Sequence, residues 1–159
     1  MTEQQTCRSG LQLAFVNVNG LGDQGKRHQL FQALQRSPYD LLLVAETKCG
    51  SDAQAVEWIQ QGAGPGLPWT GGAHWNHGTS HARGVAIFTR AGLVMDDLQT
   101  DFQDAEGRLL RISWKDAFKN KWAAVVVYAP VETGTQRPDF FSLEGPLCQA
   151  LTAGDPAAR

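Results

Sequence analysis

Two apolar runs and the segment between them decide the fold: the chain reads LQLAFVNVNGL from Leu11 to Leu21 and DLLLVAETKC from Asp40 to Cys49. Each run has the length of a strand and is followed by polar residues. Between them, residues 26–35 place apolar side chains on one helical face, and Ser37-Pro38 ends that helix because proline lacks an N–H donor. Strand, helix and strand predict a right-handed crossover that joins two parallel strands.

The carboxyl ends of these two predicted strands carry the polar side chains Asn17 and Glu46. Parallel strands share a carboxyl edge, so we expect both side chains at the same rim of the sheet. Open α/β sheets bind their ligands at that rim. Residues 41–45 are apolar at every position, which predicts a strand that is covered on both faces.

The predicted elements give a mixed α/β sheet that is rich in antiparallel hairpins after residue 80. Ser51 and Gln54 form a capping box for a short helix that carries Ala55, Val56 and Ile59. The remaining predicted elements are a polar loop at 74–81, a buried strand at 84–89, an exposed acidic connection at 96–106, a half-exposed strand at 108–114, a basic turn at 115–121, a buried strand at 122–129 and one helix at 140–151.

The composition is that of a soluble globular domain, with 159 residues, 42% hydrophobic and 19% charged. A net charge of −2 neither indicates nor excludes nucleic-acid binding, because a local patch is enough to bind phosphates. Three cysteines without a CxxC pair favour a reducing, intracellular setting. We expect residues 1–10 to be a flexible leader without a secretory signal, and no apolar stretch is long enough to cross a bilayer.

Five short motifs occur in an order that resembles the endonuclease/exonuclease/phosphatase superfamily. They are Asn17-Val-Asn-Gly-Leu, Glu46-Thr-Lys-Cys49, the stretch 83–90, Asp104-Ala-Glu-Gly-Arg108 and Val127-Tyr-Ala-Pro130. The pattern is most similar to apurinic/apyrimidinic endonucleases and to the endonuclease domains of non-LTR retrotransposons. The resemblance covers roughly residues 10–151, and it implies an α/β (α+β) fold: part of a four-layer sandwich of the deoxyribonuclease I-like type with a mixed sheet.

The resemblance also implies a role for three side chains. Glu46 matches the glutamate that binds the catalytic Mg²⁺ (or Mn²⁺), a hard cation that is held by one or two carboxylates, water and substrate phosphate. Asn17 matches an asparagine that orients the metal site or the phosphate, and Tyr128 a tyrosine that stabilises charge on the scissile phosphate. Without the resemblance, each residue also has a structural interpretation. Glu46 would be a solvated acid, Asn17 a turn-favouring asparagine, and Tyr128 a core aromatic with its hydroxyl at the rim.

For other polar residues the sequence gives weaker support for a contact with metal or DNA. Asn19 falls where relatives carry Asp or Asn near the metal, although an ordinary Asn-Gly turn explains it as well. Arg137 lies where relatives place a cation that contacts DNA. We interpret the lysines between 115 and 121 as a solvated basic turn rather than as a contact for phosphate groups. The histidines between 74 and 81 lack the spacing of a closed zinc site, so a loop that stacks Trp75 or a histidine on a base is favoured over a metal role.

The later landmarks of the superfamily have no counterpart in the sequence. Relatives next carry a strand followed by Gly-Asp-Phe-Asn, and later an Asp–His pair. Gly154-Asp155 does not match, because it directly follows a predicted helix and precedes Pro156. All four histidines precede this point. We therefore expect residues 11–159 to be the N-terminal part of such a domain, with its C-terminal part missing.

The leading functional hypothesis is a DNA endonuclease whose full-length form hydrolyses phosphodiester bonds with Mg²⁺ (or Mn²⁺), this chain being a truncated and inactive fragment. Whether the chain is itself an enzyme therefore stays open. One alternative is a non-catalytic remnant that binds nucleic acid or a protein. Another is a phosphatase of the same superfamily, which the Glu46-Thr-Lys-Cys49 motif disfavours. The expected partner is DNA, with no membrane association; a monomer is expected, and a nuclear location if the gene derives from a retrotransposon.

Overall fold

The computed structural model describes residues 10–130 and 136–154, together with their side chains except those of residues 136–138. Its first sheet has four strands in the order β1-β2-β4-β3. These strands are β1 (Leu13–Asn17), β2 (Leu41–Ala45), β4 (Val85–Thr89) and β3 (Gly72–Asn76). Strands β1 and β2 are parallel, with Asn17 opposite Ala45, and the other two pairings are antiparallel. The predicted parallel pair is confirmed.

The second sheet is antiparallel, with its three strands in the order β5-β6-β7. They are β5 (Asp96–Gln103), β6 (Leu109–Lys115) and β7 (Lys121–Val127). The two sheets face each other, and β2 lies in the middle of the molecule with four of its five residues buried. A strand covered on both faces was the expectation from its unbroken apolar run.

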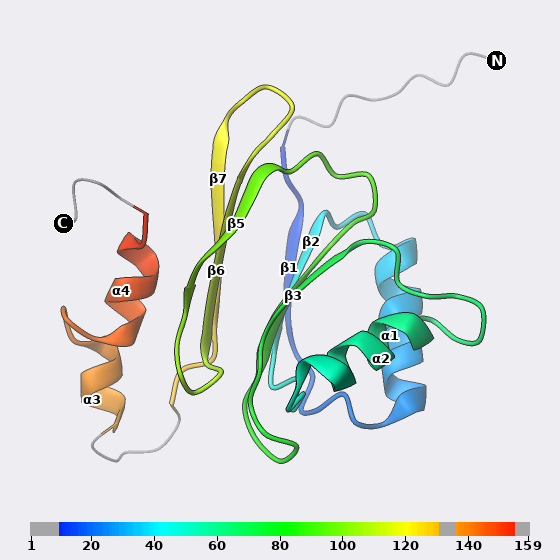
Figure 1. Cartoon of the computed structure of the whole chain (residues 1–159), viewed down its shortest axis with the longest axis horizontal. Helices are drawn as coiled ribbons and strands as arrows, with labels where there is room; N and C mark the ends of the chain where they lie inside the picture. The colour runs from blue at the N-terminus through cyan, green and yellow to red at the C-terminus, as the bar shows by residue number, and fades with distance from the viewer. Residues whose placement is uncertain (1–9, 131–135, 155–159) are drawn as a thin grey trace.

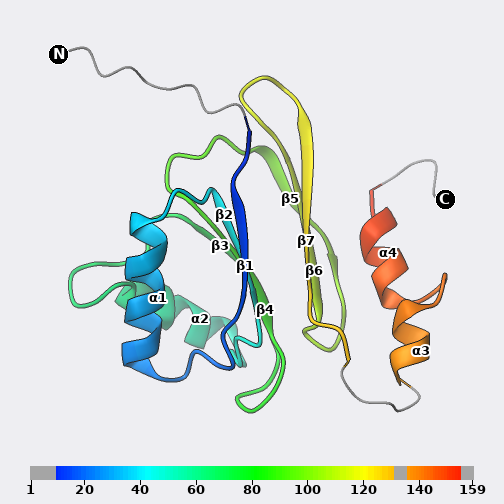
Figure 2. The same cartoon turned by 180° about the vertical axis from the view of Figure 1, so that it is seen from behind.

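Helices cover the outer face of each sheet and complete four layers, as Figures 1 and 2 show from opposite sides. The helices are α1 (Gln24–Arg36), α2 (Asp52–Gln61), α3 (Gln136–Phe141) and α4 (Pro146–Thr152). Phe31 of α1 and Trp58 of α2 pack on the first sheet, whereas Phe140 and Ala150 pack on the second. A third apolar cluster fills the space between the sheets. The layered architecture matches the predicted sandwich.

The prediction of a polar loop at 74–81 was wrong at its beginning, where β3 pairs with β4 from Gly72 to Asn76. The Trp75 ring packs edge-on against Phe88, with 5.3 Å between ring centroids, and against Trp58 of α2. Strand β3 is the outer strand of its sheet in the part that the structure describes. Polar side chains are tolerated at such an edge, so the histidine-rich sequence concealed a strand.

The prediction of an exposed connection at 96–106 was also wrong, because β5 occupies most of it. The strand is indeed exposed along most of its length, but it pairs with β6 through irregular steps between Asp96 and Gln99 and between Thr100 and Phe102. Its hydrogen bonds are backbone bonds, which an acidic sequence does not prevent. The strand predicted at 122–129 is β7, whose first three residues are exposed rather than buried.

The single helix predicted at 140–151 is two short helices. Gly145 caps α4 and Pro146 begins it, which interrupts the backbone hydrogen bonds of a continuous helix. Phe140 is buried, but Leu143 is 90% exposed and Leu151 is 56% exposed. In α2 half of the predicted capping box is present, since Ser51 Oγ accepts from the Gln54 amide, but Gln54 Oε1 accepts from the amide of Gly50 rather than from that of Ser51. Val56 is exposed. None of the described helices is long and apolar enough to cross a membrane.

Candidate active site

Asn17 and Glu46 lie together where β1 and β2 end. Asn17 is the last residue of β1, and Glu46 directly follows β2. The Asn17 amide nitrogen Nδ2 donates to Glu46 Oε1 at 3.1 Å. The structure confirms the prediction that both side chains lie at the same rim of the sheet, because the parallel register brings both strand ends to the same edge.

The backbone after β2 turns sharply to present Glu46. Glu46 has φ of 58° and Lys48 has φ of 53°, a left-handed conformation that costs free energy in residues other than glycine. Two backbone bonds hold this turn: the Thr47 amide donates to Gly84 O at 2.9 Å and the Lys48 amide to Arg83 O at 2.9 Å. Thr47 is fully buried between them. The glutamate therefore stands on a fixed turn rather than on a loose loop.

Tyr128 reaches the same rim from the second sheet. It follows β7, and its backbone amide donates to Arg108 O at 2.7 Å. Its hydroxyl lies close enough to the Glu46 carboxylate for the two groups to shift each other's pKa. The Arg108 guanidinium carbon lies 5.3 Å from the centroid of the Tyr128 ring. The structure thus brings Asn17, Glu46 and Tyr128 together from three strands and both sheets.

The charges of this group are settled by its hydrogen bonds. The pKa of Glu46 is lowered, first by the bond from Asn17, then by the bond from Tyr128, with a smaller contribution from the charge of Lys48. Partial burial opposes this shift and does not reverse it. The pKa of Tyr128 is raised, first by burial and then by the neighbouring carboxylate. At neutral pH the group is therefore a carboxylate beside a protonated phenol that can donate.

This donor set fits a hard divalent cation that keeps several water ligands. Glu46 is ionised and only half-buried at the rim. Within residues 10–130 and 136–154, no group of three or more His, Cys, Asp or Glu side chains could hold a metal ion. Mg²⁺ is commonly bound through one or two carboxylates, water and substrate phosphate, so one carboxylate is a minimal but sufficient protein contribution.

Asn19, the other residue predicted near a metal, has a different partner. Its side-chain Oδ1 accepts from Lys48 Nζ at 2.8 Å, and its backbone amide donates to Asn17 Oδ1 at 3.0 Å. Its φ of 47° is that of a turn residue. The structure therefore shows Asn19 as a support of Asn17 and Lys48, and its role as a metal ligand stays a prediction.

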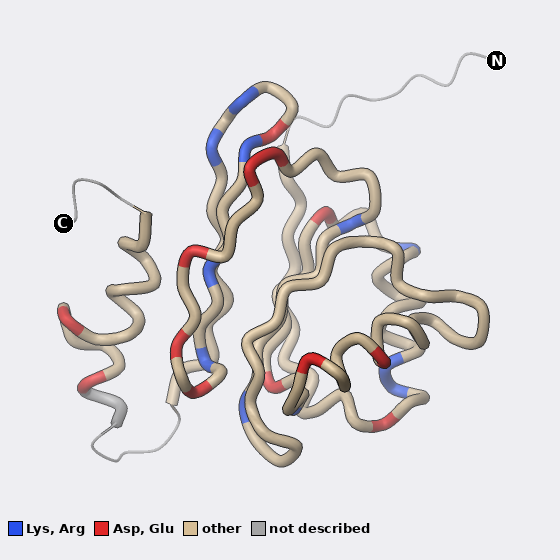
Figure 3. The backbone as a smooth tube through the Cα atoms, in the orientation of Figure 1, with Lys and Arg blue, Asp and Glu red and all other residues tan. Residues whose placement is uncertain are grey.

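Arg137 lies in the first turn of α3, and its side chain is outside the described residues, so its predicted contact with DNA stays a prediction. The basic turn pairs with acids at the start of β5: Lys115 Nζ lies 2.8 Å from Asp97 Oδ2, and Lys119 Nζ lies 2.8 Å from Asp96 Oδ2. Figure 3 shows these opposite charges side by side at the β6–β7 hairpin. The interpretation as a solvated, neutralised turn fits these pairs.

The histidines do not converge on one point. His74 lies within β3, and His77 Nε2 is 2.7 Å from Asp52 Oδ1. Trp75, which was considered as a platform for a base, packs its ring against core aromatics instead.

Sequence reasoning missed the supporting roles of Lys48, Arg108 and Asn76. Lys48 and Arg108 stand in the quoted motifs, which was the available signal. Nothing in the sequence indicated a role for Asn76, because its hydrogen-bond partners lie in distant parts of the chain.

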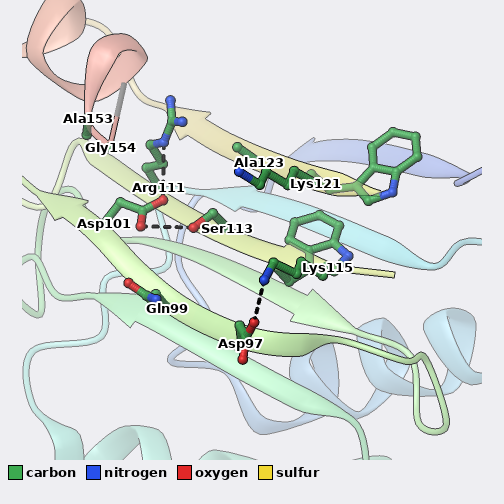
Figure 4. A pocket seen from close by; sticks show the side chains of 12 residues that line it. Asp97, Gln99, Asp101, Arg111, Ser113, Lys115, Lys121, Ala123, Ala153 and Gly154 are labelled. Atoms are coloured by element: carbon green, nitrogen blue, oxygen red, sulfur yellow. Dashed lines mark hydrogen bonds and ion pairs between the residues drawn. The ribbon is translucent and has the colours of Figure 1, made fainter. Parts of the chain in front are cut away.

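A groove on the second sheet lies away from these residues. It has a volume of about 510 Å³ and lies on the outer face of β5–β7, beside the end of α4. Figure 4 shows bonds between several of its polar side chains: Lys115 to Asp97, and Asp101 to both Arg111 and Ser113. Because the groove shares no residue with the rim and these charges are internally paired, we assign it no part in the chemistry.

Comparison with known proteins supports the fold. No family model matches the chain, and no curated protein matches it in sequence. Among solved structures, it is similar to the AP endonuclease LMAP from Leishmania major, with a TM-score of 0.57, 18% identity, and coverage of 82% of this chain and 44% of that chain. It is also similar to the catalytic domain of APE2 from Xenopus laevis, with a TM-score of 0.50, 15% identity, and coverage of 80% of this chain and 48% of that chain.

These likenesses confirm the predicted fold, a deoxyribonuclease I-like sandwich. The chain spans less than half the length of either structure.

Proposed function

We propose that the rim formed by Asn17, Glu46 and Tyr128 serves Mg²⁺- or Mn²⁺-dependent hydrolysis of DNA phosphodiester bonds in a longer form of this protein. The observation that carries the proposal is the convergence of three side chains: Asn17 donates a hydrogen bond to the Glu46 carboxylate, and the Tyr128 phenol of the other sheet helps to lower the pKa of Glu46. The name of one similar structure, an AP endonuclease, supports DNA as the substrate.

Each side chain has a distinct task in this proposal. Glu46 binds the cation, which when bound supplies Lewis-acid stabilisation of the phosphate. Asn17 fixes the orientation of the carboxylate through its bond to Oε1. Tyr128 directs its hydroxyl to the rim, where it donates to a phosphate oxygen as negative charge develops. The turn at Glu46 and Lys48 keeps these groups in place before substrate binds, so little reorganisation is needed.

A hollow next to the rim offers contacts for the DNA backbone. It has a volume of about 320 Å³, adjoins the beginning of α1, and is lined by Asn19, Lys26 and Lys48 among others. Both ammonium groups are anchored, Lys26 to Val18 O and Lys48 to Asn19 Oδ1. Positive charge beside a metal-binding carboxylate suits a polyanion, and such contacts weaken as salt increases.

A second candidate is DNA binding without cleavage by this chain on its own. The observation that favours it is the single carboxylate of the rim, since no acidic cluster able to hold a metal occurs among the described residues. Hydrolysis also requires a group that activates the attacking water. Salt-dependent binding to duplex DNA without nicking supports this candidate, and absence of binding at low salt removes it.

Nicking of supercoiled plasmid in the presence of Mg²⁺ tests the proposal. For this chain alone we expect no nicking above background, and activity that is lost in Glu46→Gln contradicts that expectation. For a longer form that contains the chain, we expect nicking in the wild type, its loss in Glu46→Gln, and its retention in Glu57→Gln, which alters an exposed glutamate of α2. Equal activity in both variants of the longer form removes Glu46 from the chemistry.

A further inference from the structure

The turn between β5 and β6, residues 104–108, is closed by one carboxylate. Asp104 Oδ1 accepts from the backbone amide of Arg108 at 2.8 Å and from that of Leu109 at 2.9 Å. Its second oxygen accepts from the Glu106 amide at 3.4 Å. Gly107 supplies the positive φ of 72° that the turn requires. Asp104 therefore sets the shape of this turn.

Asn76, the last residue of β3, ties the turn to the other sheet. Its Nδ2 donates to Asp104 Oδ1 at 2.8 Å, to Asp104 O at 3.0 Å and to Leu109 O at 2.8 Å. Asn76 is 9% exposed, so these bonds are sheltered from water. Breaking a buried bond of this kind leaves polar groups without partners, which costs more than the bond itself contributes. We call this pair the Asn76–Asp104 clasp.

The clasped turn touches the candidate site through backbone bonds on both sides. Toward Glu46, the Gly84 amide donates to Gly107 O at 2.9 Å, and Gly84 O in turn accepts from the amide of Thr47. A side chain at Gly84 would meet Thr47 Oγ1 at 2.4 Å, and one at Gly107 would meet His77 O at 2.4 Å. The backbones are therefore packed too closely to move independently.

Toward Tyr128, the same turn supplies both the backbone acceptor and the aromatic contact. Arg108 O accepts from the Tyr128 amide at 2.7 Å, and the Arg108 guanidinium stacks on the phenol ring. Arg108 Nε also donates to Glu106 Oε2 at 3.1 Å, within the turn. A displacement of the turn therefore displaces Tyr128 relative to Glu46.

We propose that Asn76 and Asp104 are positioning residues of the candidate site, and that their clasp holds the Tyr128 hydroxyl of one sheet against the Glu46 carboxylate of the other. Neither residue contacts the rim directly. The relevance of the Asn76–Asp104 clasp to catalysis rests on the proposed function. The coupling between the clasp and the position of Tyr128 is a property of the fold, and it is measurable without metal or DNA.

Fluorine NMR of protein labelled with 3-fluorotyrosine tests the coupling. The chain has two tyrosines, Tyr39 and Tyr128, so Tyr39 provides an internal reference. Glu46→Gln defines the resonance position of a Tyr128 that has lost its carboxylate partner. We expect the Tyr128 resonance of Asn76→Ala to move most of the way to that position and the Tyr39 resonance to stay unchanged.

Three further variants separate positioning from general damage. Asp104→Ala, on a partly exposed turn, must shift Tyr128 in the same direction, and it decides the question if Asn76→Ala does not fold. Asp104→Asn keeps an acceptor oxygen in the side chain, so we expect its Tyr128 resonance to lie at the wild-type position. Gln103→Ala is the matched control, because Gln103 Nε2 also joins β5 to β3, through Trp75 O at 3.3 Å, but does not touch the turn.

A wild-type Tyr128 resonance in folded Asn76→Ala or in Asp104→Ala overturns the proposal, and so does an equal shift in Gln103→Ala. These outcomes are separate from the fate of the proposed function, because the spectra are recorded without metal or DNA. Failure of Glu46 to support nicking in the longer form removes the proposed function and leaves the coupling intact.

Discussion

His74 is a half-buried residue of β3 whose environment resists protonation. Its Nε2 is buried and makes no hydrogen bond to the described residues. Burial lowers the pKa of His74 below its ordinary value of 6.5. The unfolded chain therefore takes up a proton at a higher pH than the folded chain does. It follows that the free energy of unfolding falls as the pH falls below about 6.5.

We predict that His74→Gln reduces this acid sensitivity. Between about pH 7.5 and about pH 5.5, the urea midpoint of the wild type should fall further than that of the variant, because glutamine at position 74 takes up no proton on unfolding. His81→Gln, at an exposed position, is the control and should behave like the wild type. Identical pH dependence of His74→Gln and the wild type contradicts this explanation.

Residue placement was predictable where it followed from strand direction. Asn17 and Glu46 end parallel strands, so chain order and chirality were enough to bring them together. Lys48 shows the limit, because its bond to Asn19 depends on two residues with positive φ that no periodicity reveals. The clasp formed by Asn76 and Asp104 joins residues 28 positions apart, and only the packing of the two sheets determines it.

At the scale of elements, the cost of a phenylalanine substitution should follow its place in the layers. Phe31 of α1 is fully buried, with ring centroids 5.6 Å from Trp69 and 5.3 Å from Phe88. Phe15 of β1 is 60% exposed. We predict that Phe31→Ala lowers the free energy of unfolding by about 3–5 kcal/mol, because it leaves a cavity in the core.

The matched variant Phe15→Ala should cost less than about 1 kcal/mol, because the side chain is already largely in water. Chemical denaturation of both variants measures the difference. Equal losses would show that α1 does not pack on the first sheet as described, or that the exposed face of β1 is covered in solution.

Elements with a strong apolar pattern were predictable, the edge strands β1 and β7 included, whereas polar edge strands were not. Strands β2 and β4 are central and apolar, so composition alone indicated them. Strands β3 and β5 are edge strands whose polar residues resemble loops, and backbone pairing determined their structure. The helix break at Gly145-Pro146 had a local signal, since proline cannot continue a helix, but the apolar period on both sides of it concealed the break.

At the scale of the whole molecule, the two sheets share the candidate site. The first sheet supplies Asn17 and Glu46, and the second supplies Tyr128, so the site exists only when the sheets pack on each other. The apolar cluster between them includes Ala45, which precedes Glu46 directly, and Val126, which lies two residues before Tyr128. Core packing and site geometry are therefore coupled, and the four-layer arrangement was predictable from the resemblance rather than from periodicity.

The central claim is that Glu46 binds a divalent cation at this rim. Paramagnetic broadening by Mn²⁺ in proton–nitrogen correlation spectra tests it most directly, in the wild type and in Glu46→Gln. The account predicts selective broadening of the backbone amides of residues 17–19 and 46–48 in the wild type and its loss in Glu46→Gln. Broadening that persists in the variant, or that centres elsewhere, such as on Asp52 and His77, would contradict it.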